Sequence, residues 1–141
     1  MRSLFIALAI GAAAALPLSL PASAQDQVLT APPGGAFQPV SALVPLPEFL
    51  PGLGQLFVDP ATLPAGPFLA YDHDGTLVST IYMLPVADLA PGKGFDNLSA
   101  PGGAVDHVDV YFNAGHPGVE TPHAHVVLWH VPAADEARVA E

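Results

Sequence analysis

The residues with the clearest chemical potential are histidines, which gather toward the C-terminal end of the sequence. Five of the six histidines fall within the 24 residues from His107 to His130. The carboxylates of Asp109 and Glu120 lie in this stretch, and that of Asp106 directly precedes it. Imidazole nitrogens bind transition metals and exchange protons near neutral pH, and carboxylates orient imidazoles or act as bases. This density indicates a functional site.

Two of these histidines, His123 and His125, are separated by one residue at the start of an apolar run. Alternate side chains of a β-strand point to the same face, so this spacing places both imidazoles on one side of a sheet. A third ligand from a neighbouring strand or turn would complete a site for zinc, iron or manganese with open positions. The candidate metal ligands are His107, His116, His123 and His125, and the candidate catalytic or orienting carboxylates are Glu120 and Asp109.

Two predicted strands position these residues, Val105 to Phe112 and His123 to Val131, joined by a turn-rich segment. The two strands can pair as an antiparallel hairpin. If the residue numbers of each opposing pair add to an even number, the odd-numbered residues of both strands lie on one face. Asp109 is then expected near His125, with His107 one pair further along. His130 is expected to face the opposite side.

The same residues also allow an interpretation without a metal. Histidines beside proline-rich turns often donate hydrogen bonds to loop carbonyls, which would make a structural or pH-responsive network. Two functions therefore stay open. The first is an exported envelope protein that binds a small molecule or assembles with copies of itself. The alternative is a metal-dependent enzyme, a hydrolase or an oxygen-handling enzyme, in which Glu120 or Asp109 acts as a base.

Upstream, the segment FLAYDHDGTLV carries two aspartates between β-rich runs at residues 68–71 and 76–84. Asp-Gly between such runs is typical of a β-hairpin turn. The segment is also similar to the opening motif of the haloacid-dehalogenase-type phosphatases, in which Asp72 would be the nucleophile and Asp74 the general acid. The sequence after Gly75 continues with a β-strand pattern, and only 66 residues follow Gly75, too few for the α/β domain of those phosphatases. We therefore expect the hairpin turn and not the phosphatase site.

The order of elements predicts a mainly β fold. Strands with short connections favour an antiparallel sheet, closed or folded over as a small barrel or sandwich. A proline-rich stretch at residues 25–45 is expected to be an extended or disordered lead-in, residues 46–132 a single β domain, and residues 133–141 an acidic tail. Residues 46–58 are expected to form an ordered irregular segment or an edge strand.

Residues 1–24 have the pattern of a secretory signal peptide. Arg2 provides a positive start, Leu4 to Leu16 an apolar core, and Ala22-Ser23-Ala24 a small-residue cleavage site. We therefore expect a periplasmic or secreted protein that begins at Gln25. No later stretch has the roughly 18 consecutive apolar residues that a membrane-spanning helix needs.

The charge of the remaining chain limits its partners. After residue 24 only Lys93 and Arg138 stand against thirteen carboxylates, which gives a formal net charge of −11 with neutral histidines. Such a surface repels phosphate backbones and anionic lipids, so we expect no nucleic-acid partner and no membrane attachment. The chain has no cysteine, so its stability has to come from packing, self-association or a bound ion.

Three short motifs lie between Leu63 and Val131: Asp-His-x-Asp at 106–109, Gly-His-Pro-Gly at 115–118 and Pro-His-x-His at 122–125. Together they resemble a family of small exported bacterial proteins that carries a domain of unknown function. The matching positions are Asp106, His107, Asp109, Gly115, His116, Pro117, Gly118, Glu120, Pro122 and His123. The resemblance implies an antiparallel β-fold and no established activity. Because histidines occur at both 125 and 130, it leaves the third ligand open.

Overall fold

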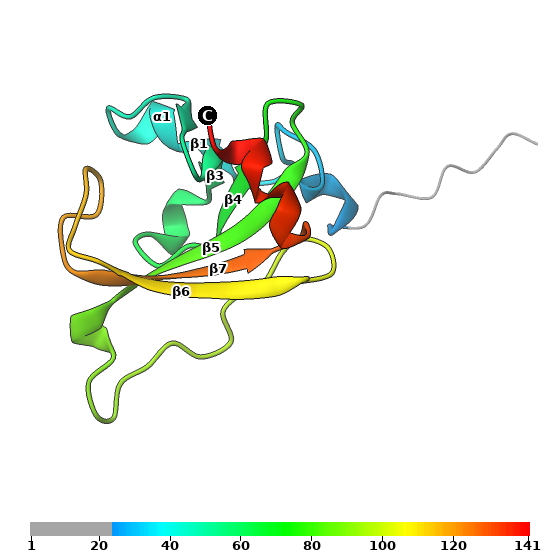
Figure 1. Cartoon of the computed structure of the whole chain (residues 1–141). Coiled ribbons are helices and arrows are strands. Elements are labelled where there is room, and N and C mark those ends of the chain that lie inside the picture. The colour runs from blue at the N-terminus through cyan, green and yellow to red at the C-terminus, as the bar shows by residue number, and fades with distance from the viewer. Residues whose placement is uncertain (1–23) are drawn as a thin grey trace, which may run out of the picture.

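The structure is a computed structural model that describes residues 24–141, and its main feature is an antiparallel β-sheet (Figure 1). Within these residues seven strands form the sheet in the order β1-β3-β4-β5-β7-β6, and β2 also pairs with β3. The strands are β1 (Gln38–Pro39), β2 (Phe49–Leu50), β3 (Gly54–Val58), β4 (Phe68–Tyr71), β5 (Leu77–Pro85), β6 (His107–Asn113) and β7 (His123–Trp129). The helical segments are α1 (Val40–Leu43) and the 3₁₀ turns η1 (Asp26–Val28), η2 (Pro60–Thr62), η3 (Val86–Asp88) and η4 (Ala133–Val139).

The sheet confirms the prediction of a mainly β, antiparallel fold, but the expected barrel or sandwich is wrong. The described strands form one open sheet whose outer strands, β1 and β6, do not pair with each other. Closure needs continuous pairing between the two outer strands. Strand β1 is only two residues long and contains Pro39, which has no N–H to donate to a further strand.

Strand β7 shows the alternation that the histidine spacing predicted. Its odd-numbered residues, from His123 to Trp129, are buried and its even-numbered residues are half-buried. In the β6–β7 ladder His107 pairs with Trp129 and Tyr111 with His125. Odd-numbered residues thus pair with odd-numbered residues, as predicted, and lie on one face. Asp109 was expected opposite His125, but it lies opposite Val127, two residues further along β7.

The hairpin between β4 and β5 confirms the Asp-Gly turn. One carboxylate oxygen of Asp72 accepts hydrogen bonds from the backbone N–H groups of Asp74 and Thr76, at 3.0 and 2.9 Å. Gly75 has φ +74°, a conformation that side chains disfavour. The other oxygen of Asp72 pairs with Arg138 of η4. The aspartates therefore build a turn and anchor the C-terminal segment.

The two faces of the sheet are covered by different segments. Ile81, Met83 and Trp129 belong to the main core on the face that carries the buried histidines. On the opposite face of β5 the loop between η3 and β6 is attached through its carbonyl oxygens. The hydroxyl of Tyr82 donates to the carbonyl of Ser99 at 2.5 Å. This division leaves the core-facing side of the β6–β7 hairpin to hold the site.

The segments outside the central strands also pack on the sheet. Residues 25–45 contain η1, β1 and α1, with Val28 and Val40 buried. Residues 46–58 contain β2, which among the described strands pairs with β3 alone, and β3, which lies inside the sheet between β4 on one side and β1 and β2 on the other. The expected edge strand is therefore confined to β2. The last residues form η4, with Val139 only 1 % exposed.

The signal-peptide prediction falls, apart from Ala24, outside the described residues. In the part of the chain that is described, no helix has both the length and the apolar character required to cross a membrane.

Candidate metal centre

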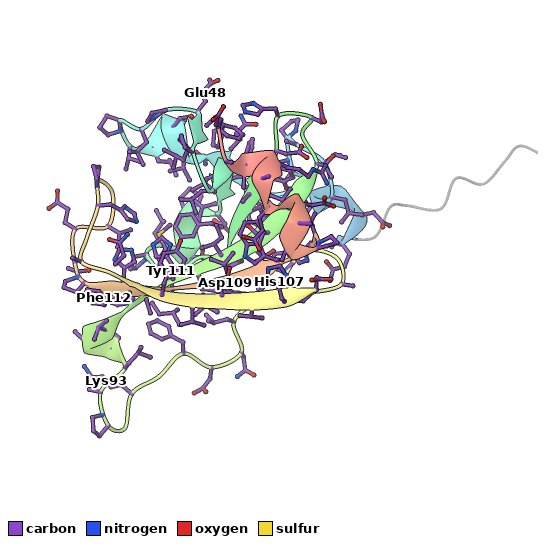
Figure 2. The ribbon with its side chains drawn as sticks, viewed as in Figure 1. Glu48, Lys93, His107, Asp109, Tyr111 and Phe112 are labelled. Carbon is purple, nitrogen blue, oxygen red and sulfur yellow. The ribbon has the colours of Figure 1, made fainter. Side chains whose placement is uncertain are left out.

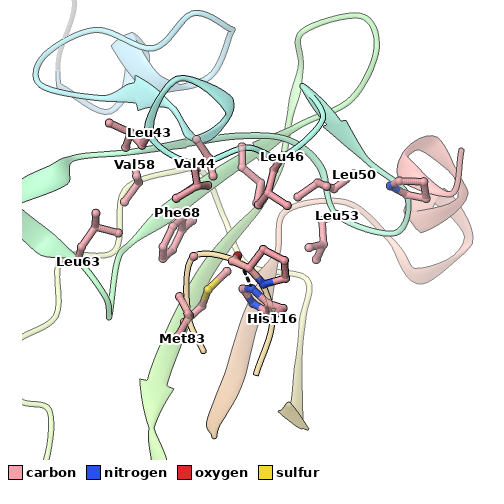
Figure 3. Close-up of a pocket in the computed structure, with 16 residues that line it drawn as sticks. Leu43, Val44, Leu46, Leu50, Leu53, Val58, Leu63, Phe68, Met83 and His116 are labelled. Carbon is pink, nitrogen blue, oxygen red and sulfur yellow. Dashed lines mark hydrogen bonds between the residues drawn. The ribbon is translucent and has the colours of Figure 1, made fainter. Parts of the chain in front are cut away.

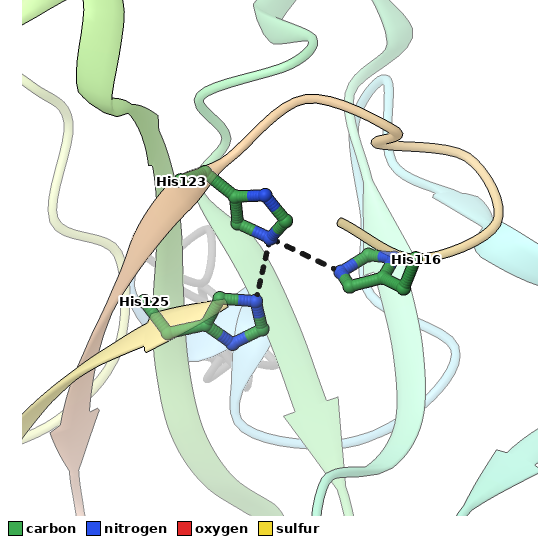
Figure 4. A group of neighbouring side chains, drawn as sticks. All are labelled: His116, His123 and His125. Atoms are coloured by element: carbon green, nitrogen blue, oxygen red, sulfur yellow. Dashed lines mark hydrogen bonds between the residues drawn. The ribbon is translucent and has the colours of Figure 1, made fainter. Parts of the chain in front are cut away.

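Three histidines converge at one end of the β6–β7 hairpin (Figure 4). His123 and His125 come from β7, and His116 comes from the turn between β6 and β7. All of their candidate ligand nitrogens lie within 4.8 Å of one another. His123 is 0 % and His125 2 % exposed, and His116 is half-buried. We call these three residues the triple-histidine cluster.

The turn between β6 and β7 explains how His116 reaches the strand. His116 and Val119 form a two-way backbone pair, with both N···O distances at 3.0 Å, around the tip Pro117-Gly118. Gly115 has φ +127°, and a Cβ there would clash with the carbonyl oxygen of Glu120. Glycine is therefore required for the two arms of the turn to approach, and this approach folds His116 back over β7.

The Nε2 atoms of the three rings face one another. The Nε2 of His123 lies 3.2 Å from that of His116 and 2.9 Å from that of His125. Two nitrogens that each lie about 2.0–2.1 Å from a tetrahedral zinc ion are about 3.3 Å apart. The spacing of the nitrogens is thus close to that of a three-imidazole metal site.

Carbonyl oxygens determine which nitrogen carries the proton in two of the rings. The Nδ1 of His116 lies 3.0 Å from the carbonyl oxygen of Pro117, and that of His123 lies 2.7 Å from the carbonyl oxygen of Thr121. A carbonyl oxygen only accepts, so each Nδ1 holds the proton and donates it. In the neutral rings both Nε2 atoms then present lone pairs across 3.2 Å. Facing lone pairs repel unless a cation or a shared proton lies between them.

Tyr111 of β6 orients the third ring. Its hydroxyl lies 3.0 Å from the Nδ1 of His125 and can either donate or accept. When Tyr111 accepts the Nδ1 proton, the Nε2 lone pair of His125 joins the other two. Burial, and then the neighbouring His123 and His116, lower the pKa of His125 to about 4, so this ring is neutral at pH 7.

His107 does not join these residues, although it was predicted as a ligand. It lies with Asp109 and Glu136 in a second group, which we call the acidic cluster, where the candidate ligand atoms are again within 4.8 Å of one another. The Nδ1 of His107 bonds Asp106 and its Nε2 bonds Glu136, both at 2.9 Å. The hydrogen bond to Asp106 has the largest effect and raises the pKa of His107. Burial opposes this rise, and the hydrogen bond and charge of Glu136 add to it.

The two predicted carboxylates also lie away from the triple-histidine cluster. Asp109 accepts a 2.9 Å hydrogen bond from the indole N–H of Trp129, and it follows His107 along β6 (Figure 2). Glu120 is exposed on the turn. His130 faces the other side as expected, where its Nε2 lies 2.9 Å from the hydroxyl of Thr80.

Sequence reasoning missed two residues that contact the histidines. Glu136 was included only in the predicted acidic tail, and nothing in its spacing points to His107. Tyr111 is an odd-numbered residue of the predicted strand, so parity already placed it on the same face as His125. We expected Asp109 opposite His125, and a shift of the pairing by two residues places Tyr111 there instead.

Comparison with known proteins places the chain in a family. A family model described as "TTHB210-like: Hypothetical protein TTHB210" matches residues 72–112, which end before the triple-histidine cluster. No protein with a curated description matches the sequence. The chain is similar to a solved structure, the hypothetical protein TTHB210 from Thermus thermophilus, with 39 % sequence identity and a TM-score of 0.57. The alignment covers 67 % of this chain and 93 % of that one. The chain therefore belongs to the TTHB210-like family of hypothetical proteins.

Proposed function

We propose that this protein is an exported metal-binding protein in which His116, His123 and His125 bind one divalent transition-metal ion. The observation that carries the proposal is the arrangement of the Nδ1 atoms. Two of them face carbonyl oxygens, so the corresponding Nε2 lone pairs point at each other across 3.2 Å. A cation between the rings converts this repulsion into coordination, whereas a network without a metal needs a proton shared between the two Nε2 atoms.

Zinc is the ion that suits this ligand set best. Zinc accepts three histidine nitrogens and leaves a fourth position open. Manganese prefers carboxylate and water ligands, and the common non-haem iron site needs one carboxylate beside two histidines. Within residues 24–141 the triple-histidine cluster contains no carboxylate.

Binding is better supported than catalysis. A hydrolytic site needs a general base within hydrogen-bonding reach of the bound water or substrate. Asp109 already accepts the indole N–H of Trp129 and belongs to the acidic cluster, and Glu120 is exposed on the turn. We therefore propose a binding role and keep the metal-dependent enzyme as the alternative.

Elemental analysis of the purified protein after dialysis against zinc tests the proposal. We expect about one zinc ion per chain, and loss of that ion in both His123→Ala and His125→Ala. His107→Ala and His130→Ala are matched controls, because they remove an imidazole from the same hairpin and should retain the zinc. A wild-type protein that binds no zinc, or controls that lose it equally, would contradict the proposal.

Self-association is a second proposal, favoured by the outer face of β6. Val108, Val110 and Phe112 are 49, 66 and 67 % exposed on a strand at the edge of the sheet. Apolar side chains gathered on an open strand commonly mark an interface. Sedimentation of the wild type should show an oligomer that Val110→Glu dissociates. A monomeric wild type would refute this second proposal.

Export rests on the residues before Gln25. Expression of the full chain in a bacterium, followed by fractionation and mass spectrometry, should give a periplasmic or secreted product that begins at Gln25. An uncleaved chain in the cytoplasm would contradict export without affecting the metal proposal.

A further inference from the structure

An apolar cavity of about 300 Å³ lies between the sheet and the segment that crosses it (Figure 3). One wall comes from α1 and residues 44–53, and the other from β3, β4 and β5, including Phe68 and Met83. Leu43 and Leu63, which are 38 and 45 % exposed, lie where the lining reaches the surface. The volume is at the lower end of the roughly 300–1,000 Å³ typical of small-molecule sites. The cavity therefore suits one short hydrocarbon chain.

The cavity meets the triple-histidine cluster at His116. Among the described residues that line the cavity, His116 is the only one with a polar side chain. Its Nε2 lies 3.2 Å from the Nε2 of His123. Met83, another lining residue, pairs directly with His125 in the β5–β7 ladder. Of the three proposed ligands His116 lines the cavity, so a molecule there would have an apolar environment along its length and this one metal ligand beside it.

Charge indicates the chemistry of the group at that end. Three neutral imidazoles leave a divalent ion with its full charge in a mostly buried site, and no carboxylate of the described residues shares the cluster. An anionic ligand at the fourth position balances that charge. The strongly acidic chain, with a net charge of −10 over its whole length, disfavours ligands with several negative charges. One negative charge on an apolar body fits both conditions.

We infer that the cavity binds a medium-chain monocarboxylate, with its hydrocarbon chain against Phe68 and Met83 and its carboxylate on the metal ion beside His116. The inference rests on the proposed metal site. It adds a ligand class to that site and links two features that are far apart in the sequence, the segment around α1 and the β6–β7 turn.

Calorimetric titration of the zinc-loaded protein tests this inference, with zinc content measured first. Octanoate should bind at least about tenfold more tightly than acetate, because its methylenes are buried in the cavity. It should also bind at least about tenfold more tightly than octan-1-ol, which lacks the anionic group that coordinates zinc. Metal-free protein should bind octanoate at least about tenfold more weakly than the zinc-loaded form.

The outcomes separate this inference from the metal proposal. Zinc binding without a preference for octanoate over acetate overturns the ligand class and leaves the metal site intact. Equal affinity for octanoate and octan-1-ol, or equal affinity with and without zinc, overturns the link between cavity and metal. A protein that binds no zinc overturns both proposals.

Two substitutions locate the binding within the cavity. Leu46→Trp places a larger side chain in the lining, and Leu63→Glu places a negative charge at its exposed part. Both should weaken octanoate binding at least several-fold while zinc content stays unchanged. Leu89→Glu is the matched control, because it adds the same charge at a leucine that is 49 % exposed and does not line the cavity. If octanoate affinity is the same in Leu63→Glu, Leu46→Trp and Leu89→Glu, the molecule binds elsewhere and the inference is wrong.

Discussion

The triple-histidine cluster and the acidic cluster lie on the same face of one hairpin, yet their chemistry is opposite. Each brings three candidate ligand atoms within 4.8 Å of one another. In the triple-histidine cluster the facing atoms are all imidazole nitrogens, and burial lowers the pKa of His125 to about 4. In the acidic cluster His107 lies between carboxylates, which raise its pKa.

The difference shows that proximity of ligand atoms is a weak criterion for a metal site. Both nitrogens of His107 already have carboxylate partners, and Asp109 already accepts the indole N–H of Trp129. These groups satisfy one another without an ion. The facing Nε2 atoms of His116 and His123 do not, because carbonyl oxygens hold the protons on the far side of each ring.

The largest expected effect is a loss of stability in acid that comes from the triple-histidine cluster. The folded pKa of His125, about 4, lies below the ordinary value of 6.5, so the unfolded chain binds the proton more readily. The metal-free protein should therefore lose stability as the pH falls from 6.5 toward 4, by about 3 kcal/mol from this residue. Urea unfolding of wild type and His125→Gln at several pH values measures the effect. If the difference between the two proteins does not depend on pH in this window, the buried neutral state of His125 is disproved.

Zinc should stabilise the protein through the triple-histidine cluster alone. At a free zinc concentration of 100 times the Kd, the expected gain in the free energy of unfolding is about 2.7 kcal/mol. Thermal unfolding with and without zinc should show this gain in the wild type and in Glu136→Gln, which alters only the acidic cluster. His123→Ala should show no gain. Loss of the gain in Glu136→Gln would transfer the metal site to the acidic cluster.

The hydroxyl of Tyr111 should strengthen metal binding without being a ligand. When it accepts the Nδ1 proton of His125, it holds the ring with Nε2 toward the ion. Removal of such a partner typically weakens metal affinity about tenfold or more. Competition with a zinc chelator should show this loss in Tyr111→Phe, with one ion per chain retained. Tyr82→Phe is the control, since its hydroxyl bonds Ser99 on the opposite face of the sheet. Equal affinities in the two variants would exclude the orienting role.

Local patterns predicted the parts of this site that depend on local geometry. The His-x-His spacing placed His123 and His125 on one face because side chains alternate along any strand. The Asp-Gly pair predicted the β4–β5 turn for an equally local reason. The register was predicted only to its parity, since hydrophobic alternation cannot distinguish shifts of two residues. For this reason we expected Asp109 opposite His125, whereas the structure has Tyr111 there.

Contacts between distant segments were beyond the sequence patterns. The pair His107–Glu136 joins a strand to the C-terminal turn, and neither residue carries a signal for the other. The apolar cavity depends on how residues 44–53 cross the sheet, in a stretch whose prolines and glycines prevent any regular period. The sequence also could not show whether the sheet is open or closed, because this depends on pairing between strands far apart in the chain.

The acidic cluster should respond to pH in the opposite direction and with the smallest effect. Because Asp106 and Glu136 raise the pKa of His107, its stabilising contribution is complete below the ordinary value of 6.5 and is lost as the pH rises through the raised pKa. The pair is partly exposed and screened by solvent, so a small change is expected. The difference in unfolding free energy between wild type and His107→Gln should shrink from pH 6 to pH 8.5, and added salt should reduce it further. A difference that grows with pH would mean that burial controls His107, and the contrast between the two clusters would then be lost.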